Sequence, residues 1–153
     1  MTLLRNPSAI VLVLATLATP RFAHADPCQL EISGNDHMQY DKQTLTVPAS
    51  CKEVTVTLHH VGKLPREAMG HNWVLVNGPD VDAVANAGMG AGLANDYVAS
   101  ADKRVLAHTK VIGGGQTSSV TFETSSLKAG GDYRYLCTFP GHHALMHGAF
   151  KFG

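Results

Sequence analysis

The chain has 153 residues and carries 12 Lys and Arg against 12 Asp and Glu, so its formal net charge is zero. It has no run of basic residues, which argues against nucleic acid or an anionic membrane surface as a partner. This length suits a single domain with one core and is short for two.

The first 25 residues are typical of a cleaved export signal. Arg5 precedes a ten-residue apolar run, and Ala-His-Ala at 23–25 supplies the small residues at which signal peptidases cut. The run is shorter than the about 20 residues that a membrane-spanning helix needs. We therefore expect export to the periplasm, cleavage before Asp26, and a mature domain of residues 26–153 that does not enter a membrane.

Most of the remaining chain has the pattern of β-strands. Apolar and polar side chains alternate from 53 to 60, which is the period of a half-buried strand. Further short segments rich in β-branched and aromatic residues are predicted as strands at 45–48, 72–77, 119–124, 132–137 and 148–152. Several short strands separated by glycine-rich turns predict an all-β sandwich or barrel.

The segment 80–102 differs from the rest because it is rich in alanine and glycine. Asp80 can cap a helix that begins at Val81, and the glycines from Gly88 onward are expected to end it. The sequence therefore predicts one short helical flap inserted between strands.

The cysteine count raises the question of an unpaired thiol. An exported protein meets oxidising conditions, so two of Cys28, Cys51 and Cys137 are expected to form a disulfide. The sequence leaves all three pairings open. Cys137 is the candidate for the unpaired thiol because metal-binding residue types surround it.

The sequence CTFPGHHALM, at 137–146, holds a thiolate, an imidazole and a thioether in Cys137, His142 and Met146. Such soft ligands suit copper, whereas magnesium and calcium prefer oxygen ligands and structural zinc sites rarely use methionine. The Pro-Gly turn between them allows all three side chains to converge. Spacing alone does not decide between His142 and the adjacent His143.

A second imidazole is needed to complete a trigonal copper site, and His71 is the candidate. It follows Gly70, where the missing side chain lets the backbone carbonyl approach a metal. Asn72 comes next and can hydrogen-bond a neighbouring backbone group or sulfur, which would orient the ligands.

Each of these residues alone has an ordinary structural explanation, as a core methionine, a hydrogen-bonded histidine or a buried thiol. Cysteine and histidine could also form a nucleophile and its base. The surrounding residues are apolar and offer neither oxyanion donors nor an orienting carboxylate. The combination therefore favours a metal site over a catalytic one, and we expect no enzyme activity.

The segments CTFPGHHALM and MGHNWVL resemble the two copper-binding segments of the azurins, bacterial blue copper proteins of the cupredoxin family. CQLEISGNDHMQY, SCKEVTVTLHHVGKLP and RVLAHTKVIG follow in the same order and spacing. The resemblance implies a Greek-key, cupredoxin-like β-sandwich with a helical flap and a Cys28–Cys51 disulfide. The implied copper ligands are His71, Cys137 and His142, with Met146 and the Gly70 carbonyl as weak axial ligands.

The resemblance also implies an apolar rim around His142, at which redox partners dock. The corresponding residues are Met38, Leu64, Met69, Met89, Phe139, Pro140, Ala144 and Leu145. Tyr40 and Ala68 stand at further rim positions, and His60 corresponds to a non-ligand histidine whose titration is linked to redox behaviour in some azurins.

The implied function is one-electron transfer in the periplasm by a monomer that holds one copper ion cycling between Cu(I) and Cu(II). The implied partners are c-type cytochromes and copper nitrite reductase. A copper storage or delivery protein without an electron-transfer role remains the alternative.

Overall fold

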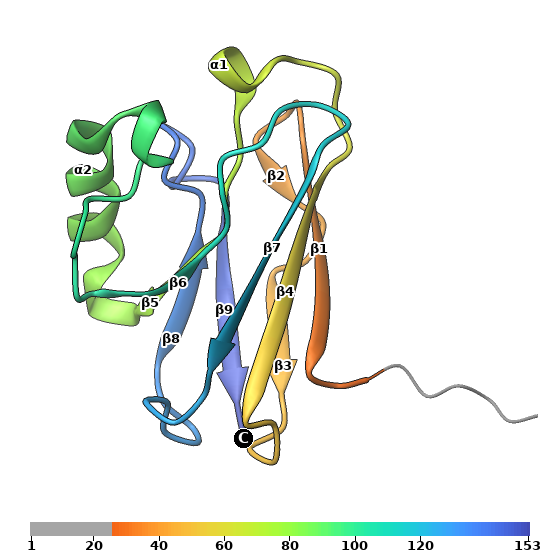
Figure 1. Ribbon diagram of the computed structural model, residues 1–153, viewed down its shortest axis with the longest axis vertical. Helices are drawn as coiled ribbons and strands as arrows, with labels where there is room; N and C mark the ends of the chain where they lie inside the picture. The colour runs from red at the N-terminus through yellow and green to blue at the C-terminus, as the bar shows by residue number, and fades with distance from the viewer. Residues whose placement is uncertain (1–25) are drawn as a thin grey trace, which may run out of the picture.

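The computed structural model describes residues 26–153, so the expected signal segment and its cleavage site lie outside the described residues. Two β-sheets pack face to face, with a helix at one side (Figure 1). The strands of the described chain are β1 (Gln29–Asn35), β2 (Gln39–Tyr40), β3 (Thr44–Val47), β4 (Glu53–His60), β5 (Val74–Asn77), β6 (Val105–His108), β7 (Thr117–Glu123), β8 (Tyr133–Leu136) and β9 (His147–Phe152). The helical elements are α1 (Arg66–Met69), η1 (Gly78–Asp80), α2 (Val81–Ala91) and η2 (Leu93–Asn95).

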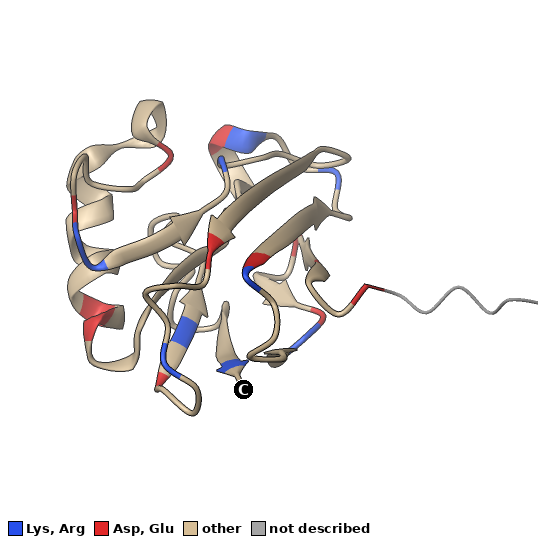
Figure 2. Ribbon diagram, turned by 60° about the horizontal axis from the view of Figure 1, so that its bottom comes forward, with Lys and Arg blue, Asp and Glu red and all other residues tan. Residues whose placement is uncertain are grey.

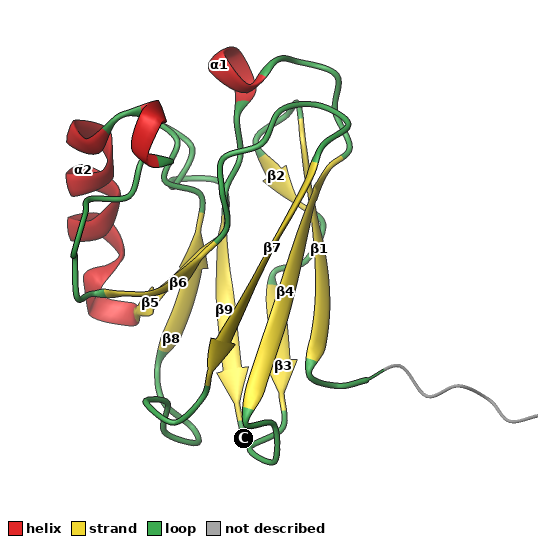
Figure 3. Cartoon of the chain, in the orientation of Figure 1, coloured by secondary structure: helices red, strands yellow, loops and turns green. Residues whose placement is uncertain are grey.

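One sheet has the strand order β2-β1-β4-β7 and the other β3-β9-β8-β5-β6. The pairs β1–β4 and β3–β9 are parallel, and the remaining neighbours are antiparallel. Strands dominate the described chain and helices are confined to one side and one end (Figure 3). This confirms the expected β-sandwich with one helical flap.

Strand β4 shows how the alternating pattern produces the two faces of a sheet. Val54, Val56 and Leu58 are fully buried between the sheets. On the outer face, Thr55 and Thr57 each bond a hydroxyl of β7 at 2.9 Å. Because side chains alternate along a strand, the two histidines that end β4 point to opposite faces, as predicted.

The interior between the sheets is organised around Trp73. Its side chain is completely buried, and its ring centroid lies 6.0 Å from that of Tyr135 and 6.2 Å from those of Phe122 and Phe150. Aromatic rings at such separations contribute packing energy beyond their buried area. They give the sandwich a rigid base beneath the loops at one end.

The disulfide joins Cys28 and Cys51, whose Cα atoms are 5.7 Å apart, and Cys137 is free and buried. The expected pairing is confirmed. The bond ties the start of β1 to the loop that precedes β4, at the end of the sandwich opposite α1 (Figure 1).

The flap helix α2 begins at Val81 and ends at one of the glycines from Gly88 onward, as predicted, although it does not end at the first of them. It continues to Ala91 and ends at Gly92, whose φ of 73° favours glycine. Gly88 does not end the helix but lets it pack closely against the segment that follows. A Cβ there would lie only 2.2 Å from the Tyr97 carbonyl oxygen, so only glycine lets the helix approach this closely.

Acidic and basic residues are scattered over the described chain (Figure 2). Within residues 26–153, no helix combines the length and apolarity needed to cross a membrane.

Candidate metal centre

Two loops at one end of the sandwich bring His71, Cys137 and His142 together. His71 lies between α1 and β5, Cys137 follows β8, and His142 lies in the β8–β9 loop (Figure 1). The side chains are 0%, 0% and 3% exposed. Their possible ligand atoms lie within 4.8 Å of one another, and within residues 26–153 no other group of three or more such side chains forms a metal cluster.

His71 is fixed on both sides of its ring. Its Nε2 lies 2.9 Å from the Asn35 carbonyl oxygen, which can only accept a proton, so Nε2 carries the hydrogen. This leaves Nδ1 free of a proton and directed at Cys137, whose Sγ is 4.0 Å away. The His71 backbone is held as well, through two bonds of 3.0 and 2.9 Å with Ile112.

Cys137 is anchored through its own backbone and through that of its neighbour. Its N–H donates to the Met146 carbonyl at 2.9 Å. Asn72 accepts the Thr138 N–H at 2.9 Å and donates to the Thr138 hydroxyl at 2.7 Å. The side chain of Asn72 therefore bonds the residue after Cys137, which is one of the two possibilities that the sequence allowed.

The tight β8–β9 loop places His142, and not His143, in the cluster. His142 Nδ1 is 3.7 Å from Cys137 Sγ, whereas His143 is half-exposed and outside the group. The His142 N–H donates to the Phe139 carbonyl, and the Met146 N–H returns to the His142 carbonyl. The geometry therefore favours the register in which four residues separate cysteine and histidine.

The two expected axial positions border the same cluster. The Gly70 carbonyl oxygen is 4.0 Å from Cys137 Sγ. Met146 is completely buried. A Cβ built on Gly34 would lie 2.8 Å from His71 Cδ2 and 3.2 Å from Met146 Cε, so the thioether end of Met146 lies beside the His71 ring.

The donor set fits a copper ion. Ligands that bind one metal at about 2.0 Å (nitrogen) and 2.3 Å (sulfur) in a plane lie roughly 3.7 Å apart. The Sγ–Nδ1 separations of 3.7 and 4.0 Å match this spacing. One thiol and two imidazoles, with a thioether nearby, form the soft, three-ligand set that copper prefers.

Burial controls the protonation of all three groups. It lowers the pKa of His71 and of His142 to about 4, so both imidazoles are neutral at pH 7. It raises the pKa of the Cys137 thiol to about 12, against the opposing effect of the Asn72 and Phe139 N–H groups. Without a metal the cluster is therefore uncharged.

His60 lies behind the cluster and is not part of it. Its ring stacks on His71 with centroids 4.4 Å apart. Its Nε2 lies 2.8 Å from the Met69 carbonyl, and its Nδ1 accepts the Gly62 N–H at 3.1 Å. Both ring nitrogens are thus occupied, and the His60 ring supports the His71 ring by stacking on it.

The metal-free protein should lose stability between pH 7 and pH 5. In that window the unfolded chain protonates His71 and His142 near pH 6.5, while the folded chain, with pKa values of about 4, does not. The unfolded state therefore binds more protons, and stability falls by roughly 2 kcal/mol per histidine. Urea unfolding at the two pH values measures this loss.

The matched variants His142→Gln and His143→Gln distinguish the effect of a histidine in the cluster from that of a neighbouring histidine outside it. The first should lose about half of the pH dependence and the second should keep it. A free energy of unfolding that is equal at pH 7 and pH 5 in the parent protein would contradict the protonation states given above.

Copper binding at pH 7 should release one proton per ion. The thiol of Cys137 is protonated before binding and both imidazoles are already neutral, so only the thiol gives up a proton. A pH indicator in weakly buffered solution counts the protons. Cys137→Ser should reduce the count to near zero, and a parent protein that releases none would show that the thiol does not bind as a thiolate.

The residues expected at the rim differ in exposure. Leu64, Met89 and Leu145 are 42%, 47% and 58% exposed, and Pro140 and Ala144 are also exposed. Met38 and Met69 are half-buried, and Phe139 is buried against the His142 ring with centroids 4.6 Å apart.

The placement of Tyr40 at the rim was wrong. Its side chain is 4% exposed, and its hydroxyl donates to the Asn72 carbonyl. The ring packs edge-on against Tyr135, with centroids 5.6 Å apart. Because the hydroxyl finds a buried acceptor, the ring can turn inward and join the core.

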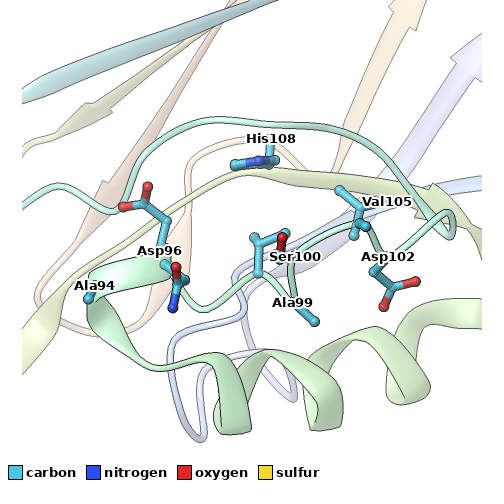
Figure 4. Close-up of a pocket in the computed structure, with 10 residues that line it drawn as sticks. Ala94, Asp96, Ala99, Ser100, Asp102, Val105 and His108 are labelled. Carbon is cyan, nitrogen blue, oxygen red and sulfur yellow. The ribbon is translucent and has the colours of Figure 1, made fainter.

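A groove on the flap has a chemistry different from that of the metal cluster. Figure 4 shows Asp96, Ser100, Asp102 and His108 along it. Its carboxylates already have partners, since Asp102 pairs with Arg104 at 2.7 Å and Asp96 accepts the Val111 N–H at 2.8 Å. The groove therefore offers no free carboxylate for a second cation.

Two residues of the cluster's surroundings were missed in the sequence. The Asn35 carbonyl orients His71, and a backbone acceptor has no signature in side-chain identity. Gly34 lets β1 approach the His71 ring. An isolated glycine within a strand indicates such close approach and could have indicated it here.

Comparisons with known proteins agree with this geometry. The family model for copper-binding proteins of the plastocyanin/azurin family matches residues 26–153. Azurin-1 of Alcaligenes xylosoxydans xylosoxydans is 58% identical over 124 residues, covering 81% of this chain and 96% of that protein. Azurin of Pseudomonas aeruginosa is 49% identical over 140 residues, covering 92% and 93%. A solved azurin of Methylomonas sp. strain J superposes with a TM-score of 0.80 at 44% identity, covering 82% of this chain and 98% of its own.

Proposed function

The chain belongs to the copper-binding plastocyanin/azurin family, and from this premise we propose that it carries single electrons between redox proteins of the periplasm. The bound ion is copper, held by His71, Cys137 and His142, with Met146 and the Gly70 carbonyl as weak axial ligands. When bound, copper supplies a redox couple between Cu(I) and Cu(II). The observation that carries the proposal is the buried, uncharged convergence of one thiol and two imidazoles on a rigid sandwich.

The chain's own residues hold this cluster in one arrangement. His71 is fixed by Asn35 and Ile112, and Cys137 by Met146 and by the bonds of Asn72 to Thr138. Ligands that are fixed before binding need little rearrangement when the charge of a bound ion changes. Their burial also keeps water from taking a ligand position.

Of the three expected ligands in the described chain, only His142 has exposed residues next to it in the sequence. Pro140, Gly141 and Ala144 are exposed around it, and Leu145 lies beyond them. An apolar surface with few charges suits brief docking through a small interface, as in other redox encounters. We propose that c-type cytochromes, and copper nitrite reductase where it is present, dock on this rim, and that the protein acts as a monomer without enzyme activity.

Export precedes this function. Cleavage before Asp26 would leave residues 26–153, the part matched by the family model, as the mature periplasmic domain. Mass spectrometry of the protein isolated from the periplasm would test the cleavage site.

Stopped-flow mixing of the copper-loaded, oxidised protein with a reduced c-type cytochrome tests the function. The proposal expects fast oxidation of the haem and retention of copper, even with a Cu(I) chelator present. Leu145→Glu should slow the transfer without changing the copper spectrum, whereas Thr121→Glu on the exposed face of β7 should leave the rate unchanged. Transfer of copper to the chelator without electron transfer would support a storage or delivery protein instead.

A further inference from the structure

The turn after η2 contains two adjacent residues in an unusual conformation. Asp96 and Tyr97 have φ values of 55° and 51°, in the left-handed region that non-glycine residues seldom adopt. Of the non-glycine residues with positive φ in the described chain, only these two are adjacent. Such strain persists where surrounding contacts fix it, and it gathers at functional sites.

The backbone of this turn contacts the segments that carry His71 and Cys137. The Asp96 carbonyl accepts a bond of 2.8 Å from the Asn72 side-chain amide. The same amide group donates to the Thr138 hydroxyl, and the side-chain oxygen Oδ1 of Asn72 accepts the Thr138 N–H. One side chain thus joins the flap, the residue after His71 and the residue after Cys137.

The Asp96 side chain contacts a second support of His71. Its Oδ1 accepts the Val111 N–H at 2.8 Å. The following residue, Ile112, exchanges two backbone bonds with His71. Val111 itself lies against Gly70, since a Cβ on that glycine would be 2.6 Å from Val111 Cγ1.

The Tyr97 ring contacts the part of the β8–β9 loop that leads to His142. Its centroid lies 5.2 Å from that of Phe139 in an edge-on arrangement, and Phe139 packs on the His142 ring. Behind the turn, Gly88 of α2 packs so closely on the Tyr97 carbonyl that it leaves no room for a Cβ. The Asp96–Tyr97 pair therefore packs between the flap helix and the two segments that carry the three expected ligands.

We propose that Asp96 and Tyr97 are positioning residues of the copper centre, which transmit the packing of the flap to His71, Cys137 and His142. The flap then serves to set the spacing of the ligands and not only to cover one side of the sandwich. This inference rests on the proposed copper site and deepens it.

Replacing Asp96 by glycine and by asparagine tests the role. Asp96→Gly accepts the left-handed conformation without strain but loses the bond to Val111. The apparent Kd for Cu(II), measured by competition with a chelator, should rise about tenfold or more, and the thiolate-to-copper absorption should change in position and relative intensity. Asp96→Asn keeps an acceptor oxygen and tolerates the left-handed region, so it should restore the Kd and spectrum of the parent.

Two matched variants on the same flap control for general effects. Ala101 is exposed and has a φ of 60°, so Ala101→Gly relieves similar backbone strain away from the ligands. Asp102→Asn removes a flap carboxylate that bonds only Arg104 side-chain and backbone groups. Both can shift the melting temperature of the metal-free protein, but neither should move the Kd or the spectrum.

These measurements distinguish a failure of the inference from a failure of the proposed function. If Asp96→Gly lowers only the melting temperature and keeps the parent Kd and spectrum, the pair is structural and the inference is wrong. If Asp96→Gly does not fold, Tyr97→Leu decides by the same two measurements, because it removes the contact with Phe139 and leaves the Asp96 bonds in place. A parent protein that binds no copper would instead overturn the proposed function itself.

Discussion

Replacing Cys137 with serine should abolish the blue absorption of the copper-loaded protein. The colour comes from charge transfer between a thiolate and Cu(II), and a serine hydroxyl supplies no comparable donor. Serine is nearly isosteric with cysteine and the site is completely buried, so the metal-free variant should remain folded. Visible absorption after addition of one equivalent of Cu(II), with circular dichroism of the same sample, measures both effects.

The disulfide cysteines provide the matched control. The double variant Cys28→Ser with Cys51→Ser removes the cross-link at the opposite end of the sandwich. It should lose about 3 kcal/mol of stability by the chain-entropy model and keep the blue colour. A Cys137→Ser protein that stays blue would show that Cys137 does not supply the thiolate. A double variant that turns colourless while folded would show that the colour depends on Cys28 or Cys51.

Replacing His142 with glycine should open the copper centre to added imidazole. The imidazole of His142 is buried in a loop whose neighbouring residues are exposed, so its removal leaves a space that a small ligand can enter. The variant should bind copper with an altered spectrum, and millimolar imidazole should restore a spectrum close to that of the parent. A titration followed by visible absorption gives the result.

His143→Gly is the control for the register of the loop. His143 is half-exposed and lies outside the cluster of ligand atoms. Its removal should leave both the spectrum and the response to imidazole unchanged. If His143→Gly loses the colour while His142→Gly keeps it, five residues separate the ligands and the loop is rearranged on binding.

Local patterns in the sequence predicted six of the nine strands of the described chain and missed β1, β2 and β6. The alternation over 53–60 places Val54, Val56 and Leu58 inside, as β4 shows. The odd cysteine and its soft neighbours indicated copper before any geometry was available. By contrast, the choice between His142 and His143 needed the resemblance, because both spacings are sterically feasible.

What the sequence did not predict depends on contacts between distant segments. Gly88 is inside a helix and not at its end because the Tyr97 carbonyl lies against it. Tyr40 is buried because the backbone carbonyl of Asn72, 32 residues further along the chain, accepts its hydroxyl. The acceptor for His71 is a backbone oxygen of Asn35, and backbone groups are the same in every residue.

The most direct test of the copper centre is anomalous diffraction at the copper absorption edge from crystals loaded with one equivalent of Cu(II). The proposal predicts one strong peak between His71 Nδ1, Cys137 Sγ and His142 Nδ1, near the Met146 side chain and the Gly70 carbonyl. A principal peak at another site, such as the exposed histidine His143, or a peak that Cys137 does not touch, would contradict it.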